Sequence, residues 1–379
     1  MRIELTDDQA AVRTMVQTFM DTEVAPIAGK IDKTGEFPTK TVERMGELGL
    51  MGINVPEKWG GAGADNVTFA LVAEEINRVC GSHGVIYGAN NSLTCGPINN
   101  FGNEDQKQRY LVPLAQGKHY GCYALTEPQA GSDAASLRTK AVLDKDEWVL
   151  DGQKVFISNG AVAHTAIVFA RTGKDPGPKG VSAFIVPMRT KGVRVGKNEK
   201  KLGLRASPTN QLFFEGVRVP KGNLLGKEGE GFKIAMATLD GGRIMAAAGS
   251  TGIMRACKEE SIAYALERKQ FGAPIASYQA IQWKIADMAV HEEAARLLYM
   301  RAATLKDQGV PFTKEASMAK LFASERAMDA TIENIQIHGG NGYTTDYPAE
   351  RHFRDIKVFE IFEGTSEIQR VVISRHLLS

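Results

Sequence analysis

A block of short, strand-like segments divides an otherwise helical sequence, and this order constrains the fold more than any other feature. Between about His119 and Gly229, the runs TAIVFA, VSAFIVP and NQLFFEGVRVP are apolar or alternating and are bounded by glycine and proline. Their spacing predicts a small β-barrel or sandwich and not βαβ units. Within this block we expect WVLDGQKVFI to form a hairpin around Asp151-Gly152.

Helical patterns occupy both flanks of this block. Thr6, followed by Gln9 three residues later, predicts a capping box at the first helix. After Glu230, short breaks at FGAP and GVPF separate long helices and indicate the antiparallel packing of a bundle. Two apolar stripes mark these helices, one made of Ile281, Ile285 and Met288, the other of Met318, Leu321, Phe322, Ile332 and Ile335. The prediction is an α+β multidomain chain, with an α-helical domain over 1–118, a β domain over 119–229 and a helical bundle over 230–379.

Composition argues against several classes of protein. A chain of 379 residues with 43% apolar residues can form two or three domains, and its net charge of +2 gives no electrostatic basis for binding nucleic acid. The four cysteines are scattered without a CxxC motif, so no zinc site or other metal and no disulfide framework is expected. No stretch is long and apolar enough to span a membrane. We expect a cytoplasmic protein, or one of the mitochondrial matrix if a transit peptide has been removed.

Two segments of the β block contain groups suited to a flat ligand. ALTEPQAGSDAAS, residues 124–136, offers hydroxyls and backbone amides that could bind the edge of a ring, although it also suits an ordinary Gly/Ser turn. VFISNG would direct Phe156 and Ser158 to one face of a strand, where the ring could cover a ligand and the hydroxyl could donate to it. The alternative is a core phenylalanine beside a surface serine.

Two segments of the helical C-terminal part have similar potential. In ERKQFGAPIASYQ, Arg268 and Phe271 could reach a phosphate and a ring, although an arginine also suits the C-terminal end of a helix. In QIHGGNGYTTDYPAERHFRD, the glycines permit close backbone approach to a ligand, whereas His338 is better explained as a structural histidine. No Gly-x-Gly-x-x-Gly motif follows a strand and opens a helix, so the phosphates of any nucleotide cofactor would need another set of N–H and hydroxyl donors.

A fifth segment, IFEGTSEIQR, holds an acid in apolar company near the C-terminus. Glu363 follows Ile361 and Phe362 and precedes Gly364. It could be an acid near the start of a helix or a catalytic base. Apolar neighbours and exclusion of water raise the pKa of a carboxylate and make it a stronger base, and a glycine beside it allows close approach to a ligand.

Together the five segments closely resemble the acyl-CoA dehydrogenase family, essentially from end to end. ALTEPQAGSDAAS and QIHGGNGYTTDYPAERHFRD are similar to the two signatures of that family, in the same order. The segments GANNSL, GEGFKIAMATLDGGRI and SEIQRVVISRHLL make the chain most similar to the short-chain, butyryl-CoA type. The resemblance implies an α-helical N-terminal domain, a β middle domain and a C-terminal four-helix bundle. It also implies FAD as cofactor and assembly as a homotetramer.

The resemblance also implies a role for individual residues. The FAD of the same subunit would be lined by Tyr123, Leu125, Thr126, Gly131, Ser132, Phe156, Ile157 and Ser158. The FAD of the neighbouring subunit would be reached by Arg268, Phe271, Gln279, Gln336, Ile337, Gly339 and Gly340, and FAD phosphates and adenosine would lie near Thr365, Ser366 and Glu367. The acyl-CoA would contact Ser132, Asp240, Gly241, Gly242, Arg243 and Gly364.

Glu363 would then be the catalytic base. It would remove the pro-R α-proton of a thioester while a β-hydride passes to flavin N5, with the thioester oxygen polarised by a ribityl hydroxyl and by the backbone N–H of the base. Some family members carry the base on the bundle helix instead, at the position that Gly242 occupies here. Of these two positions, only that of Glu363 carries a residue that could act as the base.

Departures from the family pattern leave the substrate open. Phe362 replaces a tyrosine that often precedes the base, and Phe156 replaces the usual tryptophan over the flavin. The floor of the acyl pocket is expected near Gly88, Ala89 and Asn90, and Gly241 and Gly242 are small too. Small residues there would admit isobutyryl or cyclohexanecarboxyl groups as well as butyryl.

Three hypotheses about function follow. The first is an FAD-dependent acyl-CoA dehydrogenase that passes electrons to an electron-transfer flavoprotein. The second is a flavin-dependent acyl-CoA oxidase that produces hydrogen peroxide. The third is a non-catalytic assembly protein on the same fold.

Overall fold

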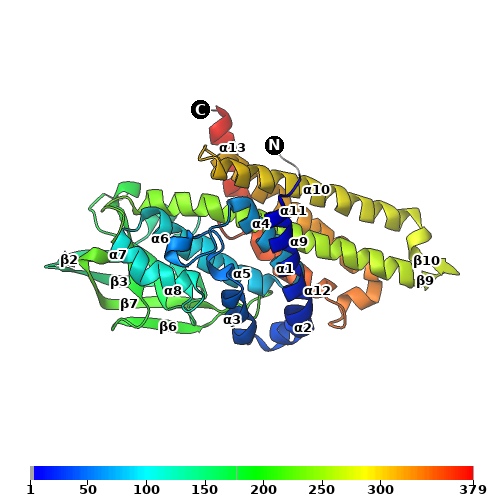
Figure 1. Cartoon of the computed structure of the whole chain (residues 1–379), viewed down its shortest axis with the longest axis horizontal. Helices are drawn as coiled ribbons and strands as arrows, with labels where there is room; N and C mark the ends of the chain where they lie inside the picture. The colour runs from blue at the N-terminus through cyan, green and yellow to red at the C-terminus, as the bar shows by residue number, and fades with distance from the viewer. Residues whose placement is uncertain (1–3, 176, 379) are drawn as a thin grey trace.

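One long helix, α9 (Gly231–Glu267), connects the two ends of the molecule. In the computed structural model, which describes residues 4–175 and 177–378, α9 runs from the β-sheet to a small hairpin of β9 (Lys269–Gln270) and β10 (Ala273–Pro274) at the far end (Figure 1). Its first residue packs directly on the sheet, because a Cβ atom on Gly231 would lie 2.6 Å from the Cα atom of Ser182. The sheet and the bundle therefore share one element.

The N-terminal part is helical, as predicted. The first helix, α1 (Asp7–Phe19), begins with the predicted capping box, in which Thr6 accepts from the Gln9 N–H and the Gln9 side chain binds the Thr6 N–H. A π-helical turn, Met20–Val24, continues it into the second helix. The remaining helices are α2 (Ala25–Thr34), α3 (Thr39–Glu47), α4 (Asn66–Val79), α5 (Gly81–Asn90), α6 (Gly96–Phe101), α7 (Glu104–Gln106) and α8 (Val112–Ala115).

Eight strands form the sheet of the middle part. Their order is β6-β7-β3-β2-β4-β5-β8, and β1 pairs in parallel with β4. The predicted runs TAIVFA, VSAFIVP and NQLFFEGVRVP are the strands β4, β5 and β7, so those predictions are confirmed. The bounds are β1 (Gly121–Ala124), β2 (Lys140–Asp144), β3 (Glu147–Ser158), β4 (Thr165–Arg171), β5 (Val181–Pro187), β6 (Val193–Asn198), β7 (Thr209–Pro220) and β8 (Leu224–Leu225).

The hairpin predicted around Asp151-Gly152 is wrong. These two residues lie inside the continuous strand β3, at a shift in its register against β7. The chain instead turns at Lys145 and Asp146, and Lys145 has a φ of 57°. Gly152 serves close packing, since a Cβ atom there would lie 2.6 Å from Oγ1 of Thr139. An Asp-Gly pair thus marks a bulge here and not a loop.

Both faces of β4 are buried, which places the sheet between two cores. Ala166 and Val168 belong to a cluster inside the curved sheet that also contains Trp148 and Phe184, whose rings lie 5.3 Å apart. Ile167 and Phe169 face the other way and pack on the N-terminal helices and on the start of α9, through Leu111, Leu114 and Ile234. The sheet is therefore fixed against α9, which also lines the cavity described below.

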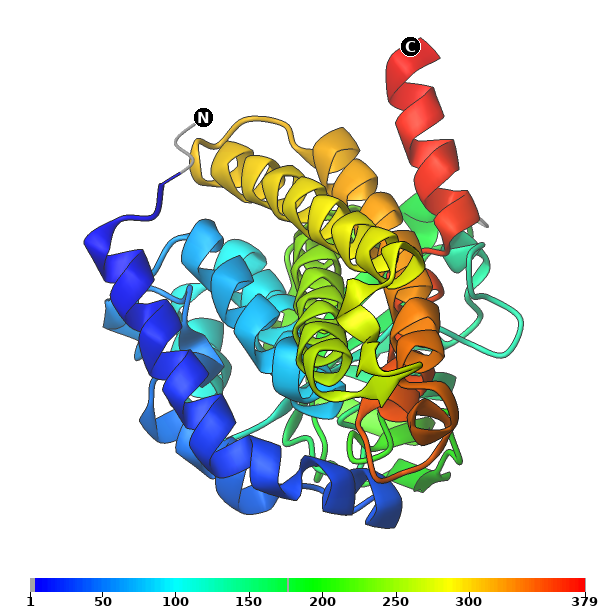
Figure 2. The ribbon, with the colours of Figure 1, turned by 90° about the vertical axis from the view of Figure 1, so that its right-hand side faces the viewer.

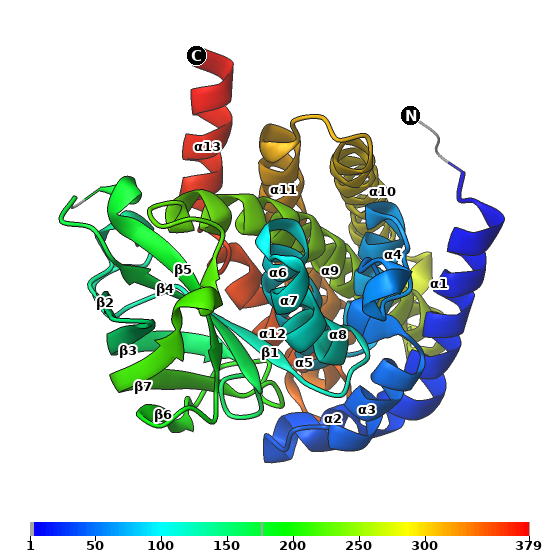
Figure 3. The same cartoon turned by 60° about the vertical axis from the view of Figure 1, so that its left-hand side comes forward.

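The C-terminal part consists of long helices, as predicted. The helices α9, α10 (Gln279–Asp307) and α11 (Thr313–His338) pack side by side, and α12 (Ala349–Ile356) and α13 (Ser366–Leu378) both contact α11. Figures 2 and 3 show α13 projecting away from this body. Within the described ranges, the molecule has no helix whose length and apolar character would let it cross a membrane.

The apolar stripe predicted on α11 faces the core only in part, through Phe322, which is partly buried against it. Met318 and Ile332 are 40% and 47% exposed, and the buried face carries small residues instead, namely Ala316, Ala319, Ala323, Ala327 and Ala330. Small side chains let α11 lie close to its neighbours, so its larger side chains remain on the outside. On the stripe of α10, Met288 is buried and Ile281 and Ile285 are partly buried.

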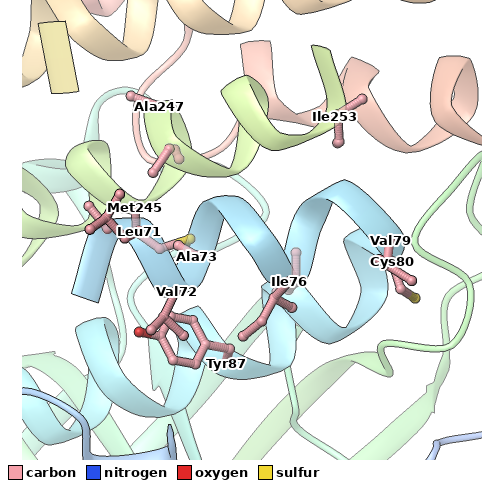
Figure 4. Close-up of a cluster of buried hydrophobic side chains, with 14 of the residues drawn as sticks. Leu71, Val72, Ala73, Ile76, Val79, Cys80, Tyr87, Met245, Ala247 and Ile253 are labelled. Carbon is pink, nitrogen blue, oxygen red and sulfur yellow. The ribbon is translucent and has the colours of Figure 1, made fainter. Parts of the chain in front are cut away.

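The core between α4 and α9 is equally close-packed. Figure 4 shows Leu71 and Ile76 of α4 beside Met245 and Ile253 of α9, with Tyr87 of α5 below them. At Gly252 the two helices nearly touch, because a Cβ atom there would overlap the carbonyl oxygen of Glu74. Neither backbone can yield without moving a helix.

We therefore predict that Gly252→Ala destabilises the protein by about 1–3 kcal/mol or more, as expected for overpacking against backbone. Thermal unfolding would measure the change. Gly222→Ala is the matched control, since Gly222 is exposed and a Cβ atom there would meet nothing within 4 Å. Equal melting temperatures for the two variants would contradict the prediction.

Candidate active site

A cavity of about 210 Å³ lies where β1, β3, α5 and α9 meet the loop before α13. It brings together residues that are far apart in the sequence and that sequence analysis had singled out separately. Those that line it are Tyr123, Leu125, Thr126, Gly131, Ser132, Phe156, Ile157, Ser158, Arg243, Glu363 and Gly364. Three of the five segments identified from sequence thus line one cavity, whereas the segments at 267–279 and 336–355 lie elsewhere.

The carboxylate of Glu363 occupies a space that a glycine leaves open. A Cβ atom on Gly242 would overlap Oε2 of Glu363 and lie 2.6 Å from its Cδ. This Oε2 atom is inaccessible to solvent and has no hydrogen-bond partner in the described part of the chain. Burial raises the pKa of Glu363 to about 7, although the positive charges of Lys320 and Arg243 oppose this rise.

The backbone around Glu363 is held in a strained conformation. Glu363 has a φ of 55° and Gly364 a φ of 92°, and only the second is a glycine. Gln369 Nε2 donates to the carbonyls of both residues, at 3.2 and 2.8 Å, and Lys320 Nζ donates to Gly364 O at 2.9 Å. With both carbonyls turned toward these donors, the N–H of Glu363 has no acceptor among residues 4–175 and 177–378.

A buried ion pair fixes the loop that follows β1. Glu127 Oε1 accepts from Lys154 Nζ at 2.7 Å and from the Thr139 N–H at 3.0 Å, and Oε2 accepts from the Arg138 N–H at 2.6 Å. Lys154 Nζ also donates to Leu125 O at 3.0 Å. Sequence analysis missed this pair, although a lysine inside an apolar strand is a readable signal of a buried partner.

The strand segment around Phe156 departs from regular alternation. A register shift separates Lys154 from Ile157, and Phe156 has a φ of 59°. As a result Phe156, Ile157 and Ser158 all line the cavity, whereas alternation predicted only the first and third. The ring of Phe156 is 69% exposed, so it is not the core phenylalanine of the alternative interpretation.

A second cavity, of about 570 Å³, lies at the other end of α9 and shares no lining residue with the first. It is lined by Arg268, Phe271, Ile337, Gly339 and Gly340 among others, and the Phe271 ring is 97% exposed. Arg268 follows Gly242 by 26 residues along α9, which corresponds to about 39 Å of helix. Nδ1 of His338 donates to Asn334 O, 2.8 Å away, and the ring stacks on Tyr264, in keeping with a structural histidine.

The remaining predicted residues line neither cavity. Asp240 accepts from Arg243 Nη1 and from Thr313 Oγ1, both at 2.6 Å. Gly242 and Gly241 lie behind the first cavity, where a Cβ atom on Gly241 would meet Nζ of Lys306 at 3.0 Å. The others outside both linings are Gln279, Gln336, Thr365, Ser366 and Glu367.

The small residues expected at the floor of the acyl pocket do not leave free space. A Cβ atom on Gly88 would overlap Cε of Met245 and lie 3.0 Å from its Sδ. Met245 lies on α9 where it crosses α4 (Figure 4), and it lines the cavity together with Ala89. The side chain of Asn90 is buried and donates to Met51 O and Leu114 O. The expectation that these residues make the pocket roomy is therefore wrong.

The first cavity has the donors that a flavin ring requires. The hydroxyls of Thr126, Ser132 and Ser158 line it and make no hydrogen bond to the described parts of the chain. Phe156 presents an exposed ring beside them, and the orphaned Oε2 of Glu363 lies in the same space. Donors for ring heteroatoms, an aromatic cover and a buried, unpartnered carboxylate oxygen together suit the flavin ring of FAD and a bound thioester.

Comparison with known proteins agrees with this geometry. Family models described as acyl-CoA dehydrogenase N-terminal, middle and C-terminal domains match residues 6–118, 122–217 and 229–378. The "Acyl-CoA dehydrogenase, short-chain specific" of Clostridium acetobutylicum is 50% identical over 374 residues, which is 99% of each chain.

Solved structures give the same result. Butyryl-CoA dehydrogenase from Megasphaera elsdenii matches with a TM-score of 0.98 and 42% identity, covering 100% of both chains. A chain in the structure of the electron transferring flavoprotein of Acidaminococcus fermentans matches with a TM-score of 0.98 and 48% identity, again over 100% of both chains. With all three domains in order and half of its residues identical to a relative of equal length, the chain belongs to the acyl-CoA dehydrogenase family of FAD-dependent oxidoreductases.

Proposed function

We propose that the protein catalyses the α,β-dehydrogenation of a short, straight-chain acyl-CoA to the 2-enoyl-CoA, with Glu363 as the base that removes the α-proton. The observation that carries this proposal is Oε2 of the Glu363 carboxylate, which is inaccessible to solvent and has no hydrogen-bond partner in the described chain. The carboxylate lies in the cavity whose other residues fit a flavin. Bound FAD supplies the acceptor for the β-hydride.

The environment of Glu363 suits proton abstraction. The α-proton of a thioester is weakly acidic, and a carboxylate in water is too weak a base to remove it quickly. Burial brings the pKa of Glu363 to about 7, so the group is a stronger base and still ionises near neutral pH. A positioned general base contributes on the order of 10²–10⁴-fold to rate.

The backbone N–H of Glu363 is suited to polarise the thioester oxygen. It has no acceptor in the described chain, and the neighbouring carbonyls are already bound by Gln369 and Lys320. A donor fixed in advance stabilises the negative charge that develops on the oxygen as the proton leaves. The strained backbone of Glu363 therefore both places the carboxylate in the cavity and leaves the N–H free to donate.

The size of the pocket supports a short acyl group. Met245 lies three residues after Gly242 on α9, about 4.5 Å further along the axis, and fills the notch above Gly88. An acyl chain whose α-carbon lies at Glu363 therefore reaches the thioether of Met245 after a short distance. The names of the C. acetobutylicum and M. elsdenii relatives point to the same class of substrate.

Self-association and an electron-transfer flavoprotein complete the proposal. The two cavities of one chain are too far apart for a single FAD, so one cofactor would draw on two chains, as in a homotetramer. Large exposed apolar side chains on the long helices support such contacts, for example Trp283, Val290 and Ile332. The match to a chain in the A. fermentans structure supports an electron-transfer flavoprotein as acceptor.

Anaerobic titration of the holoenzyme with acyl-CoA thioesters tests the reaction. We expect butyryl-CoA to bleach the flavin band, while Glu363→Gln retains FAD and binds the thioester but bleaches at least 10²-fold more slowly, since it lacks the base. Wild-type bleaching by the variant would remove Glu363 from the mechanism. Consumption of oxygen without any acceptor protein would favour the oxidase, and a protein without flavin would favour the assembly role.

The rate of bleaching should depend on pH through Glu363. Below a pH of about 7 the carboxyl is protonated and cannot accept the α-proton, so the rate should fall about tenfold per unit toward acid. Above that pH the carboxylate is ionised and the rate should level off. Stopped-flow bleaching between pH 5.5 and 8.5 measures this, and a flat profile would contradict the proposed base.

Replacement of Met245 should change the preferred chain length. Met245→Ala opens the notch above Gly88, so we expect kcat/KM for hexanoyl-CoA relative to butyryl-CoA to rise on the order of tenfold, as extra methylenes gain apolar contacts. Met254→Ala is the matched control, because Met254 is a buried methionine of α9 outside the cavity lining. An unchanged ratio in Met245→Ala would show that another residue limits the chain.

A further inference from the structure

Lys320 on α11 is a fully buried lysine, with 0% of its surface exposed. Its neighbours on the same helical face are alanines, including Ala316, Ala323 and Ala327. Its ammonium group donates to Gly364 O at 2.9 Å and forms no ion pair with a carboxylate in the described ranges. Burying a cation without a paired carboxylate is costly, so packing alone does not explain this residue.

The charge of Lys320 is directed at the catalytic carboxylate. Burial lowers the pKa of Lys320 to about 8, while the negative charge of Glu363 raises it. Arg243 lowers it further, and Glu360 and Glu325 make smaller contributions that raise it. The interaction is reciprocal, because Lys320 is the stronger of the two cations that lower the pKa of Glu363. The charge of each group therefore shifts the pKa of the other.

The other charged or titratable groups around Glu363 do not replace Lys320. Arg243 on α9 is already paired with Asp240 at 2.6 Å, so part of its charge is neutralised. Tyr123 on β1 lines the same cavity, and burial and the charge of Glu363 keep its pKa well above the ordinary value, so it stays neutral. Lys320 is thus the unpaired positive charge that acts on this carboxylate from α11.

We propose that Lys320 is a positioning residue for proton abstraction. It holds the Gly364 carbonyl so that the base loop, residues Glu363 and Gly364, keeps its strained form, and it supplies the positive charge that keeps Glu363 ionised in apolar surroundings. The role rests on the proposed function of Glu363 as base. Without Lys320, the apolar surroundings that strengthen the base would also leave it protonated at neutral pH. Lys320 therefore limits how far burial can raise the pKa of Glu363.

The test compares Lys320→Met, Lys320→Gln and Lys320→Arg with the wild-type holoenzyme. In the first readout, infrared difference titration follows the carboxyl band of protonated Glu363, identified by its absence in Glu363→Gln. The second readout is the pH profile of flavin bleaching by butyryl-CoA. FAD content and melting temperature are recorded for each variant, so that loss of folding is recognised.

We expect the titration midpoint of Glu363 to rise on the order of one pH unit in Lys320→Met and Lys320→Gln, since both lack the charge. A midpoint that moves from about 7 to about 8 lowers the ionised fraction at pH 7 from about one half to one eleventh, so bleaching at pH 7 should slow about fivefold. At high pH the variants should approach the wild-type rate. Lys320→Arg keeps the charge and should recover most of the shift.

Lys314→Met is the matched control, because Lys314 lies on the same helix, is partly exposed, and pairs with Glu315 away from the base loop. It should leave both midpoints unchanged. Unchanged midpoints in both neutral variants at position 320 would overturn the proposal, even if their rates fell uniformly at every pH. The infrared midpoint is measured without substrate, so a shift there without any bleaching would retain the coupling and reject the proposed function instead.

Discussion

The chemistry of this protein depends on the atom that is missing from Gly242. A β-carbon at that point of α9 would occupy the position of the Glu363 carboxylate, so the helix and the base can share the cavity only because the helix has no side chain there. The same helix lies against the sheet at Gly231 and against α4 at Gly252, and its Met245 side chain packs on Gly88 of α5. Because α9 makes all of these close contacts, it fixes the distances between the sheet, the base loop and the floor of the pocket.

The base loop shows how a strained conformation is maintained. Glu363 adopts a left-handed conformation that costs free energy, of order 1–3 kcal/mol for a residue other than glycine. Donors from α11 and α13 bind the two carbonyls of the loop, and they therefore leave its N–H free and its carboxylate inside the cavity. Phe156 and Phe271, which adjoin the two cavities, share this unusual backbone conformation. Of the six non-glycine residues with a positive φ in the described chain, three thus line these cavities.

Sequence patterns predicted the parts of the fold that local physics determines. The capping box at Thr6 and the strands β4, β5 and β7 need only neighbouring residues to be recognised. The failures all involve contacts between distant segments. The turn at Asp151-Gly152 became a bulge because Thr139 packs against Gly152, and the alanine face of α11 is buried because the neighbouring long helices lie so close to it.

The residues of the candidate site divide in the same way, into those that a local motif predicts and those that depend on distant contacts. Glu363, Phe156 and the loop after β1 were predicted from motifs, and their convergence on one cavity follows from the fold. Lys154, Met245 and Lys320 were missed because each acts through a partner far away in the sequence. A glycine is also ambiguous in sequence: Gly88 suggested spare volume, but a methionine from α9 already fills it. Whether a small residue creates room is decided by its neighbours in space.

The separation of the two cavities along α9 has a consequence for the behaviour of the protein in dilute solution. If one FAD is held by two chains, free energy gained on cofactor binding is also free energy of association, and the two equilibria are linked by mass action. Dilution would then release cofactor and partner chain together, and added FAD would oppose both losses. Handling and storage concentrations would in this way set the fraction of protein that retains its yellow colour.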